Sequence, residues 1–559
     1  MLPTRRLSRP LVRSLLALGG VAFAAEGAPR PAASEPAGSW SVGEPIVTYW
    51  CGPPLTDAVL RQMVEGGFNL VWCRESDLDL AARHGVRAHL TDGVLSPASL
   101  ETPEGIAKLD ALIERVRRHP ALYSYHIVDE PSAAQFPALG KLVAHIRERD
   151  PAHLAYINLF PTYASNEQLG TSGDVVTAYR EHLRLYVEIV RPALLSYDHY
   201  QFMKGSDTTQ YFLNLSMIRR AALEARVPFL AIVQASSWAP NVRVPNADEL
   251  RYLVSTTAAY GAQGISYYIY CCPNHEGGIA RPDGTPTPLY DALKSYNREF
   301  VAIAKELRAL RSLGVGHTAL AEPGCEPVPA DAPFRIAGSS ERGSDRGFLL
   351  GLFGAGDRPT HALAVNLDYA ASAVATVAGP GPLESFDAAS GAWSGSGRPE
   401  IEVRFPPGGG KLLRLAGAEA PKKPVVIYEG EYPGWPWIAR ARDGTLFCVF
   451  REGTEHDFSP GGKAIFCRSR DGGLSWTTAR VEDAEGFAGD EWDVLEVSPG
   501  RLIGAIRNNH PRTDGSPILD GGYPASVEVG PRERLIVDYE IRPSPRRIVG
   551  RFVTFPEDW

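Results

Sequence analysis

The feature that most constrains the fold is an alternation of short β-rich runs with amphipathic segments between Pro45 and about Leu313. Parallel strands joined by helical crossovers produce this alternation. Eight runs have strand composition, and they are Ile46–Trp50, Phe68–Cys73, Val86–Leu90, Leu122–Val128, His153–Leu159, Leu194–Tyr200, Phe229–Gln234 and Ile265–Tyr270. The stretch also has the size of a (β/α)8 barrel, for which about 250 residues are typical. The sequence therefore predicts such a barrel over residues 45–313.

The segments between the runs have apolar residues at helical spacing, as the crossovers of a barrel require. They are Leu55–Glu65, Ile106–Arg118, Phe136–Arg149, Val175–Val190, Thr209–Ala225 and Asp248–Tyr260, and a further helix is expected over Pro288–Leu313. A doubly wound sheet is the alternative, but no glycine-rich phosphate fingerprint follows the first run. The barrel is therefore the favoured fold.

The composition changes to strand and turn character after the barrel. The runs Gly347–Phe353, Ala362–Asn366 and Lys411–Leu415 predict a small antiparallel β-sandwich over residues 314–417. Residues 418–423, rich in Ala, Pro and Lys, have the composition of a linker. The expected organisation is thus multidomain, as the 559-residue length also indicates.

The first residues have the composition of an export signal. Four arginines between Arg5 and Arg13 precede the apolar run Ser14–Ala24, which ends in a small-x-small cleavage site. We expect residues 1–25 to be a signal peptide and residues 26–44 a disordered linker. No later run approaches the ~20 apolar residues of a transmembrane helix. The expected location is periplasmic or extracellular, with no membrane partner.

Charge and cysteine usage argue against several classes of ligand. The net charge of -8 and the pI near 6.0 give no electrostatic reason to bind nucleic acid or anionic lipid. The seven cysteines show no zinc-type spacing with one another or with histidine. We therefore expect no metal site, no cofactor and no nucleic-acid partner.

The residues at the carboxyl ends of the eight runs are rich in carboxylates, amides and aromatic rings. In a (β/α)8 barrel these ends converge on one face, where ligands bind. Aromatic rings stack on sugar rings, while carboxylates and amides bind hydroxyl groups. We therefore expect an oligosaccharide or other uncharged glycan to be bound by Trp50, Asp92, Asp129, Asn158, His199, Tyr200, Gln234, Trp238, Tyr268 and Tyr270.

The segment Tyr125–Pro131, with the sequence YHIVDEP, resembles the acid/base strand of clan-A glycoside hydrolases. In that family an Asn-Glu-Pro commonly ends the fourth strand, and its Glu protonates the leaving oxygen. The resemblance implies that Glu130 is the general acid of a glycoside hydrolase, and residues 314–417 resemble the β-sandwich behind many such barrels. An alternative is that Asp129–Ser132 only begins the next helix, with an acidic cap and an early proline.

The seventh run departs from this family. Clan-A enzymes place a nucleophilic Glu at the end of the seventh strand, but Gln234 stands here, and an amide is neither nucleophile nor base. Asp198 at the sixth run is the nearest substitute, since other glycosidase barrels pair the fourth and sixth strands. We predict Glu130 and Asp198 as the catalytic pair, retaining at ~5 Å separation and inverting at ~6.5–9.5 Å.

Three alternatives remain open for the barrel. Glu75 and Asp92 are alternative candidates for the base. Asp198 and His199 are also consistent with a structural hydrogen-bonded pair. Because Gln234 removes the usual nucleophile, the chain is also consistent with a carbohydrate-binding protein that has lost catalysis.

The C-terminal segment, residues 424–559, carries a motif of another family. Ser469–Trp476 matches the Asp-box, S-x-D-x-G-x-x-W, of sialidase-type β-propellers, and Asp520–Pro524 resembles a late blade. The resemblance implies a partial propeller, because the segment has room for about three blades. Arg451 and Arg507 resemble two of the arginines that grip a sialic acid carboxylate. Sialidase-like activity in this segment is a further alternative.

Overall fold

The computed structural model describes residues 40–339, 346–418, 425–440, 446–453, 463–469, 476–483, 489–498, 501–508, 525–530, 533–540 and 546–554. The predicted signal peptide, most of the linker over residues 26–44 and all but the first residue of the linker over residues 418–423 lie outside these ranges. Within them, no helix has both the length and the apolar character needed to cross a membrane.

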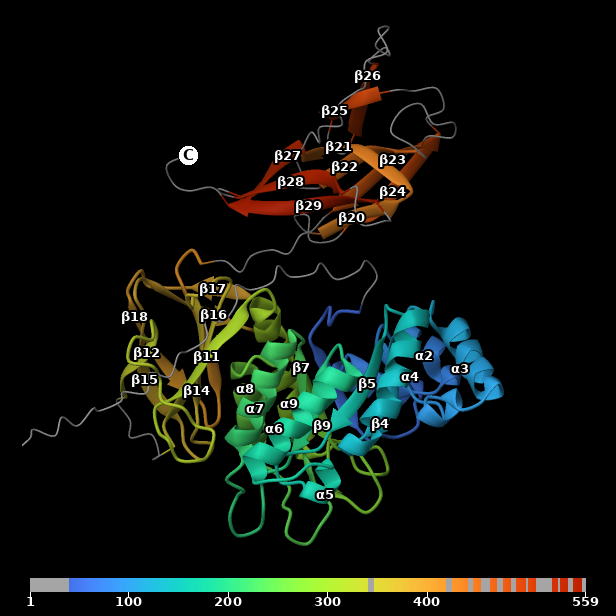
Figure 1. The fold of residues 1–559 in the computed structure, drawn as a ribbon. Coiled ribbons are helices and arrows are strands. Elements are labelled where there is room, and N and C mark those ends of the chain that lie inside the picture. The colour runs from blue at the N-terminus through green and yellow to red at the C-terminus, as the bar shows by residue number, and fades with distance from the viewer. Residues whose placement is uncertain are drawn as a thin grey trace, which may run out of the picture. The chain divides into compact units, whose positions relative to one another are not determined.

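Eight parallel strands form a nearly closed barrel, which confirms the predicted (β/α)8 fold (Figure 1). They are β1 (Ile46–Trp50), β2 (Leu70–Cys73), β3 (Arg87–Leu90), β4 (Leu122–Asp129), β5 (Leu154–Leu159), β6 (Leu195–His199), β7 (Phe229–Gln234) and β9 (Gly264–Tyr268). Their order is β1-β9-β7-β6-β5-β4-β3-β2. At the β1–β2 seam, Asn69 donates its backbone N–H to the Val47 carbonyl over 3.1 Å and accepts from Val47 N over 2.9 Å through Oδ1.

Helices surround this barrel, as Figure 1 shows. They are α1 (Asp57–Glu65), α2 (Leu78–Arg83), α3 (Pro103–Val116), α4 (Phe136–Arg149), α5 (Asn166–Leu169), α6 (Val175–Leu185), α7 (Tyr211–Ala225), α8 (Ala247–Ala259) and α9 (Pro288–Leu307). Side-chain caps at Thr56, Thr102, Asp174 and Asn246 begin four of them. Helix α9 ends earlier than expected, because strand β11 (Arg311–His317) begins a new sheet there.

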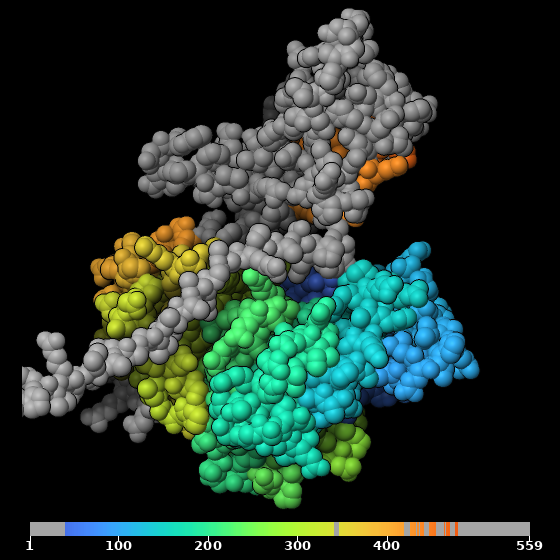
Figure 2. All heavy atoms as spheres, viewed as in Figure 1, coloured from blue at the N-terminus to red at the C-terminus, as the bar shows by residue number. Residues whose placement is uncertain are grey.

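Two apolar cores hold the barrel together, because side chains alternate along each strand. One core lies between strands and helices and contains Val47, Val71 and Tyr125. The second contains Ile46, Leu70, Tyr123, Leu154 and Leu230. These side chains are buried. The space-filling view of Figure 2 shows the outer surface of the barrel, coloured from blue to green, as a continuous layer of atoms on the side in view.

Two antiparallel sheets follow the barrel, as predicted. One has the order β11-β13-β14-β19-β16-β17 and the other β12-β15-β18. Their strands are β12 (Arg335–Ser339), β13 (Phe348–Gly354), β14 (His361–Asn366), β15 (Ala373–Ala378), β16 (Leu383–Asp387), β17 (Ala392–Ser394), β18 (Glu400–Phe405) and β19 (Gly410–Leu415). A core including Phe348, Leu350 and Phe405 lies between them, while Leu349 and Leu363 belong to the core of the barrel. The sandwich is thus packed against the barrel.

The C-terminal strands form three antiparallel sheets, ordered β20-β29-β28-β27, β21-β22-β23-β24 and β25-β26. They are β20 (Val425–Gly430), β21 (Tyr432–Arg440), β22 (Leu446–Gly453), β23 (Lys463–Ser469), β24 (Thr477–Asp483), β25 (Gly489–Ser498), β26 (Arg501–Asn508), β27 (Ala525–Gly530), β28 (Glu533–Glu540) and β29 (Arg546–Thr554). The all-β expectation is confirmed, and the propeller stays a prediction.

In the sequence, the predicted Asp-box lies between β23 and β24, which pair antiparallel. Its residues 470–475 and the segment Asp520–Pro524 lie outside the described residues. Trp476 packs against an apolar cluster that includes Cys448 and Phe450. Arg451 is buried in β22, and the side chain of Arg507 lies outside the described part. The arginine comparison with sialidases therefore stays a prediction.

Candidate active site

A cavity of about 290 Å³ opens at the carboxyl ends of the barrel strands, where the sequence places the binding face. Its walls come from β1, β4, β5, β6, β7 and β9 and from the segments that follow them. Eight predicted residues line it, and they are Trp50, Asp129, Glu130, Asn158, Asp198, Tyr200, Trp238 and Tyr268. Both predicted catalytic carboxylates thus lie in one cavity.

Glu130 enters this cavity from a left-handed turn at the end of β4. Its φ is 46°, a conformation that non-glycine residues adopt rarely and at a cost of about 1–3 kcal/mol. The backbone N–H of Glu130 donates to the Asn158 carbonyl over 2.9 Å, which holds the turn. The cap of the following 3-10 helix η3 (Ala133–Gln135) is Ser132, whose N–H donates to Gln135 Oε1 over 2.9 Å. Helix capping therefore does not use Asp129 or Glu130.

Asn158 connects the carboxylates of β4 and β6. Its Nδ2 donates to Asp198 Oδ1 over 2.8 Å and to Asp129 Oδ1 over 3.1 Å. The Ser196 hydroxyl donates to Asn158 Oδ1 over 3.0 Å and lies 2.8 Å from the Tyr156 hydroxyl. Because the Asn158 amide oxygen accepts from Ser196, the amide NH2 of Asn158 is directed at the two carboxylates.

Glu130 and Asp198 have strongly raised pKa values. Burial, and then the charge of Asp129, raise the pKa of Glu130 to about 7, while a hydrogen bond with Asp198 acts in the opposite direction. Burial, and then the charge of Glu130, raise the pKa of Asp198 well above its ordinary value. Two carboxyl groups in contact cannot both ionise easily, so the pair keeps a proton to a higher pH than an isolated carboxyl group does.

Three aromatic rings form one wall of the cavity, which we call the aromatic wall: Tyr200, Trp238 and Tyr268. The Tyr200 ring centroid lies 4.7 Å from that of Trp238 and 4.9 Å from that of Tyr268. Trp238 and Tyr268 are themselves 4.9 Å apart. Such a surface suits the apolar face of a sugar ring, and the carboxylates at β4 and β6 suit its hydroxyls.

Part of the cavity lining was not predicted from the sequence. The segment after β5 contributes Phe160, Pro161, Tyr163, Ala164 and Gln168, and β7 contributes Ile232. The lining role of the first group could have been predicted, because Phe160–Ala164 directly follow a barrel strand. Tyr163 is 44% exposed at the mouth and packs on the His199 ring, with centroids 5.1 Å apart.

Gln234 does not line the cavity, contrary to expectation. Its Oε1 accepts from Phe202 N over 2.9 Å, and its Nε2 donates to the carbonyls of Phe202 and Arg243 over 3.0 and 2.8 Å. The side chain is fully buried. The amide is therefore committed to the backbone of the two segments that follow β6 and β7.

Three other predicted binding residues also lie outside the cavity lining. His199 is buried, its Nδ1 lies 2.9 Å from Asn214 Oδ1, and burial lowers its pKa to about 4. It and Asp198 thus have different partners rather than forming a structural pair. Tyr270 is buried against Tyr49, with ring centroids 5.1 Å apart. Asp92 lines a separate hollow together with Glu75.

Within the part of the chain that the structure describes, no cluster of three or more His, Cys, Asp or Glu side chains has an arrangement that could hold a metal ion.

Comparisons with known proteins identify only distant likenesses. No protein-family model and no curated protein matches the sequence. Similar solved structures include a glycoside hydrolase family 5 protein from Bacteroides vulgatus, with 14% identity, TM-score 0.40, and coverage of 67% of this chain and 91% of that one. A family 5 mannosidase from Rhizomucor miehei has 12% identity, TM-score 0.32, and coverage of 45% and 88%.

A β-galactosidase from the psychrophilic Marinomonas ef1 has 12% identity and TM-score 0.34, with 46% of this chain covered. The alignment spans 60% of the length of that enzyme. At such low similarity the strand topology alone defines the barrel of this chain.

Proposed function

We propose that the barrel hydrolyses a glycosidic bond in an uncharged glycan, with Glu130 as general acid and Asp198 as base or nucleophile. The observation that carries the proposal is the pair itself. Two carboxyl groups with raised pKa values share a hydrogen bond in a cavity that has an aromatic wall. Glycoside hydrolysis needs one carboxyl group protonated and one ionised at the same pH.

The shared proton gives the pair both forms. Near neutral pH one proton remains on the pair, and Glu130, half-buried at the end of β4, is the group we assign to donate it to the leaving oxygen. The reaction then requires Asp198 in its ionised form, although burial and the charge of Glu130 raise its pKa. The Asn158 amide, which donates to Asp198 Oδ1 over 2.8 Å, lowers that pKa and stabilises the charge. In this state Asp198 either attacks the anomeric carbon or activates a water molecule.

The stereochemistry depends on how substrate separates the pair. A separation of ~5–5.5 Å between the two carboxyl groups in the complex favours retention, and ~6.5–9.5 Å leaves room for the water of inversion. Proton NMR of the first product distinguishes attack by Asp198, which retains the anomeric configuration, from attack by water, which inverts it.

The lining supports an uncharged substrate. Among the residues that the structure describes, the lining contains Asp129, Glu130 and Asp198 but no lysine, arginine or histidine. An anionic sugar would meet three acidic groups with no cationic partner, which is unfavourable in a confined cavity. We therefore propose neutral oligosaccharides as the ligand class.

The test is release of reducing sugar from a panel of neutral oligosaccharides by the wild type and by Glu130→Gln. We expect the variant to lose about 10²- to 10⁴-fold in turnover, the usual contribution of a general acid. Glu75→Gln is the matched control, because Glu75 lines the separate hollow and pairs with Arg115 over 2.7 Å. Equal turnover of the wild type and Glu130→Gln would refute the assignment of Glu130.

A second candidate function is glycan binding without catalysis. The commitment of Gln234 to backbone hydrogen bonds favours it, because the usual seventh-strand nucleophile position offers no reactive group. This candidate predicts saturable binding of a neutral glycan by calorimetry with no product formed. Release of product that depends on Glu130 excludes it.

We also propose that the chain is exported to the periplasm or beyond. The arginines and apolar run of residues 1–25 support this proposal. N-terminal sequencing of the protein made in a bacterial host tests it. We expect the mature protein to begin just after Ala24. A protein whose N-terminal residue is still Met1 would contradict export.

A further inference from the structure

The segments that follow β6 and β7 form one unit behind the aromatic wall. Lys204 N donates to the Asn241 carbonyl over 2.7 Å, and Arg243 N donates to the Phe202 carbonyl over 3.2 Å. The amide of Gln234 joins the same two segments. The first segment begins with Tyr200 and the second carries Trp238, so whatever fixes this unit also fixes two rings of the aromatic wall.

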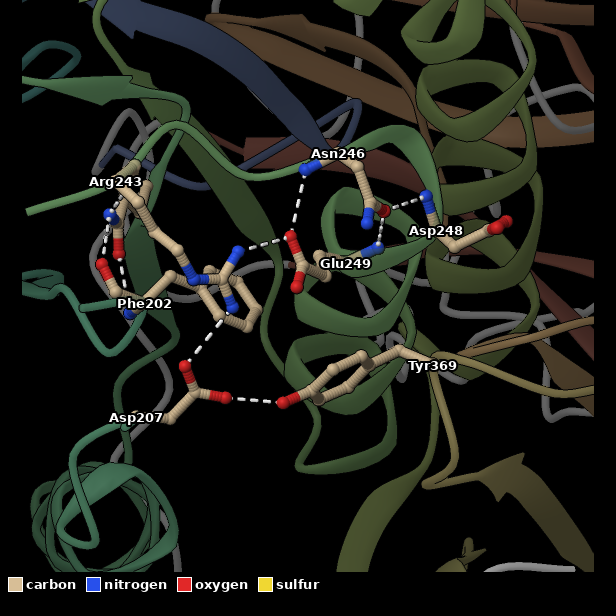
Figure 3. A network of polar contacts seen from close by, with 8 residues as sticks. Phe202, Asp207, Arg243, Asn246, Asp248, Glu249 and Tyr369 are labelled. Carbon is tan, nitrogen blue, oxygen red and sulfur yellow. Dashed lines mark hydrogen bonds and ion pairs between the residues drawn. The ribbon is translucent and has the colours of Figure 1, made fainter. Parts of the chain in front are cut away.

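A network of charged side chains connects the two segments of this unit (Figure 3). The Arg243 guanidinium contacts Asp207 over 3.1 Å and Glu249 over 2.7 Å, and it lies over the Phe202 ring at 4.7 Å. Glu249 Oε2 also accepts from Asn246 N over 2.8 Å, which fixes the start of helix α8. Arg243 thus connects the segment after β6 to the segment after β7.

The β-sandwich completes this network through Tyr369. The Tyr369 hydroxyl donates to Asp207 Oδ2, while Oδ1 of the same carboxylate accepts from Arg243 (Figure 3). The Tyr369 ring packs edge-on against Phe202 and Tyr252, with centroids 5.7 and 5.2 Å away. Tyr369 lies in the turn after β14, where Asp368 Oδ1 accepts from Ala370 N over 2.8 Å.

Asp207 depends on both partners. Its side chain is 19% exposed, so a carboxylate oxygen that loses its donor is only partly compensated by water. Without the Tyr369 hydroxyl the carboxylate is free to rotate away from its bidentate position between Tyr369 and Arg243. The segment that begins with Tyr200 would then lose this polar contact with the sandwich and keep the ring packing of residue 369 on Phe202.

We propose that Tyr369 is a positioning residue of the active site: through Asp207 and Arg243, the β-sandwich sets the aromatic wall. The sandwich then acts on the site as well as packing on the barrel. The effect on ligand rests on the proposed function, since it requires that the aromatic wall binds glycan. The effect of Tyr369 on the two segments does not rest on the proposed function.

The test compares Tyr369→Phe with Trp393→Phe. The first keeps the ring and removes the hydroxyl that binds Asp207. The second removes an indole N–H that donates to Glu306 in α9 over 3.1 Å, a contact across the same barrel–sandwich interface but away from the unit. Each variant therefore loses one hydrogen bond from the sandwich to a barrel carboxylate.

Two readouts are measured on the full chain. We expect amide hydrogen exchange in residues 200–208 and 235–246 to become roughly tenfold faster in Tyr369→Phe only, the effect of losing one hydrogen bond to a charged group. We also expect KM for the glycan to rise several-fold while kcat stays near the wild-type value. In Asp207→Ala, adding Tyr369→Phe should produce no further change.

The outcomes are distinguishable. Equal exchange in Tyr369→Phe and Trp393→Phe overturns the positioning role, even when the wild type hydrolyses glycan. Faster exchange in Tyr369→Phe together with no glycan binding by the wild type removes the proposed function and leaves the role of Tyr369 standing. An unchanged KM in a variant with faster exchange overturns the link to the aromatic wall.

Discussion

The ends of strands β6 and β7 lie side by side in the barrel, and they use buried polar side chains in opposite ways. Asp198 pairs in register with Ile232 of β7, and Gln234 ends the same strand two residues later. Asp198 contacts Asn158 and Glu130 and lines the cavity, whereas the amide of Gln234 is committed to three backbone hydrogen bonds. Position on the barrel face thus does not decide a residue's role. The role depends on whether the side chain already uses its hydrogen-bonding groups on other parts of the protein.

The largest expected effect is at β6. Asp198→Asn keeps an oxygen for the Asn158 amide but removes the negative charge, so we expect glycan turnover to fall by about 10³-fold or more. Asp92→Asn is the control, because Asp92 lies on the same face of the barrel but in the separate hollow. If both variants lose turnover equally, Asp198 has no special role.

The next effect is at β7. Gln234→Glu places a carboxylate against the Phe202 and Arg243 carbonyls, which now accept from the amide. We expect the free energy of unfolding to fall by about 1–3 kcal/mol and turnover not to rise. Chemical denaturation measures the first and an activity assay the second. A gain in turnover would mean that β7 retains a latent catalytic position, and the contrast between the strands would fail.

A smaller effect concerns the pH dependence of stability. The pKa of Glu130 is raised from 4.5 to about 7 in the folded chain, so folding favours its protonated form. This contribution is fully present below pH 4.5 and is lost as pH rises to about 7, with a slope of at most about 1.4 kcal/mol per pH unit. Urea denaturation should show a smaller loss in Glu130→Gln than in the wild type, where the remaining loss comes from Asp198, whose pKa is still raised by burial. If the free energy of unfolding depends on pH equally in the two proteins, the raised pKa of Glu130 is contradicted.

The smallest effect is at the aromatic wall. Trp238→Phe keeps a ring beside Tyr200 and Tyr268 but reduces the surface offered to a sugar. We expect glycan affinity to fall about 2- to 10-fold with little change in kcat. Calorimetry with the substrate of the wild type measures the change. A large loss of kcat instead would assign Trp238 to the reaction itself.

The sequence predicted the barrel well, because each strand is a short apolar run followed by a helix with regular apolar spacing. It also placed Glu130 and Asp198 on the correct face, since strand ends converge there whatever the loops do. The residues that it misplaced were decided by tertiary partners. Gln234 and His199 point to backbone and side-chain groups of neighbouring segments, and no local pattern reveals those contacts.

The other differences have similar causes. Helix α9 ends at Leu307 because strand β11 pairs with β13, a contact more than thirty residues away in sequence. The segment Phe160–Ala164 enters the cavity because the chain after β5 turns inward, although its place after a strand was visible. The link from Tyr369 to Asp207 joins residues of different domains and has no sequence signature.

Glu130 keeps its proton up to near neutral pH beside Asp198, and infrared spectroscopy tests this without any substrate. The infrared band of protonated carboxyl groups is recorded at each pH for the wild type and for Glu130→Gln. The spectrum of the variant is then subtracted from that of the wild type. We predict that the difference band persists at pH 6 and disappears with a midpoint near pH 7, the pKa of Glu130 in this cavity. A difference band that is lost below pH 5, as for an ordinary glutamate, would contradict the account.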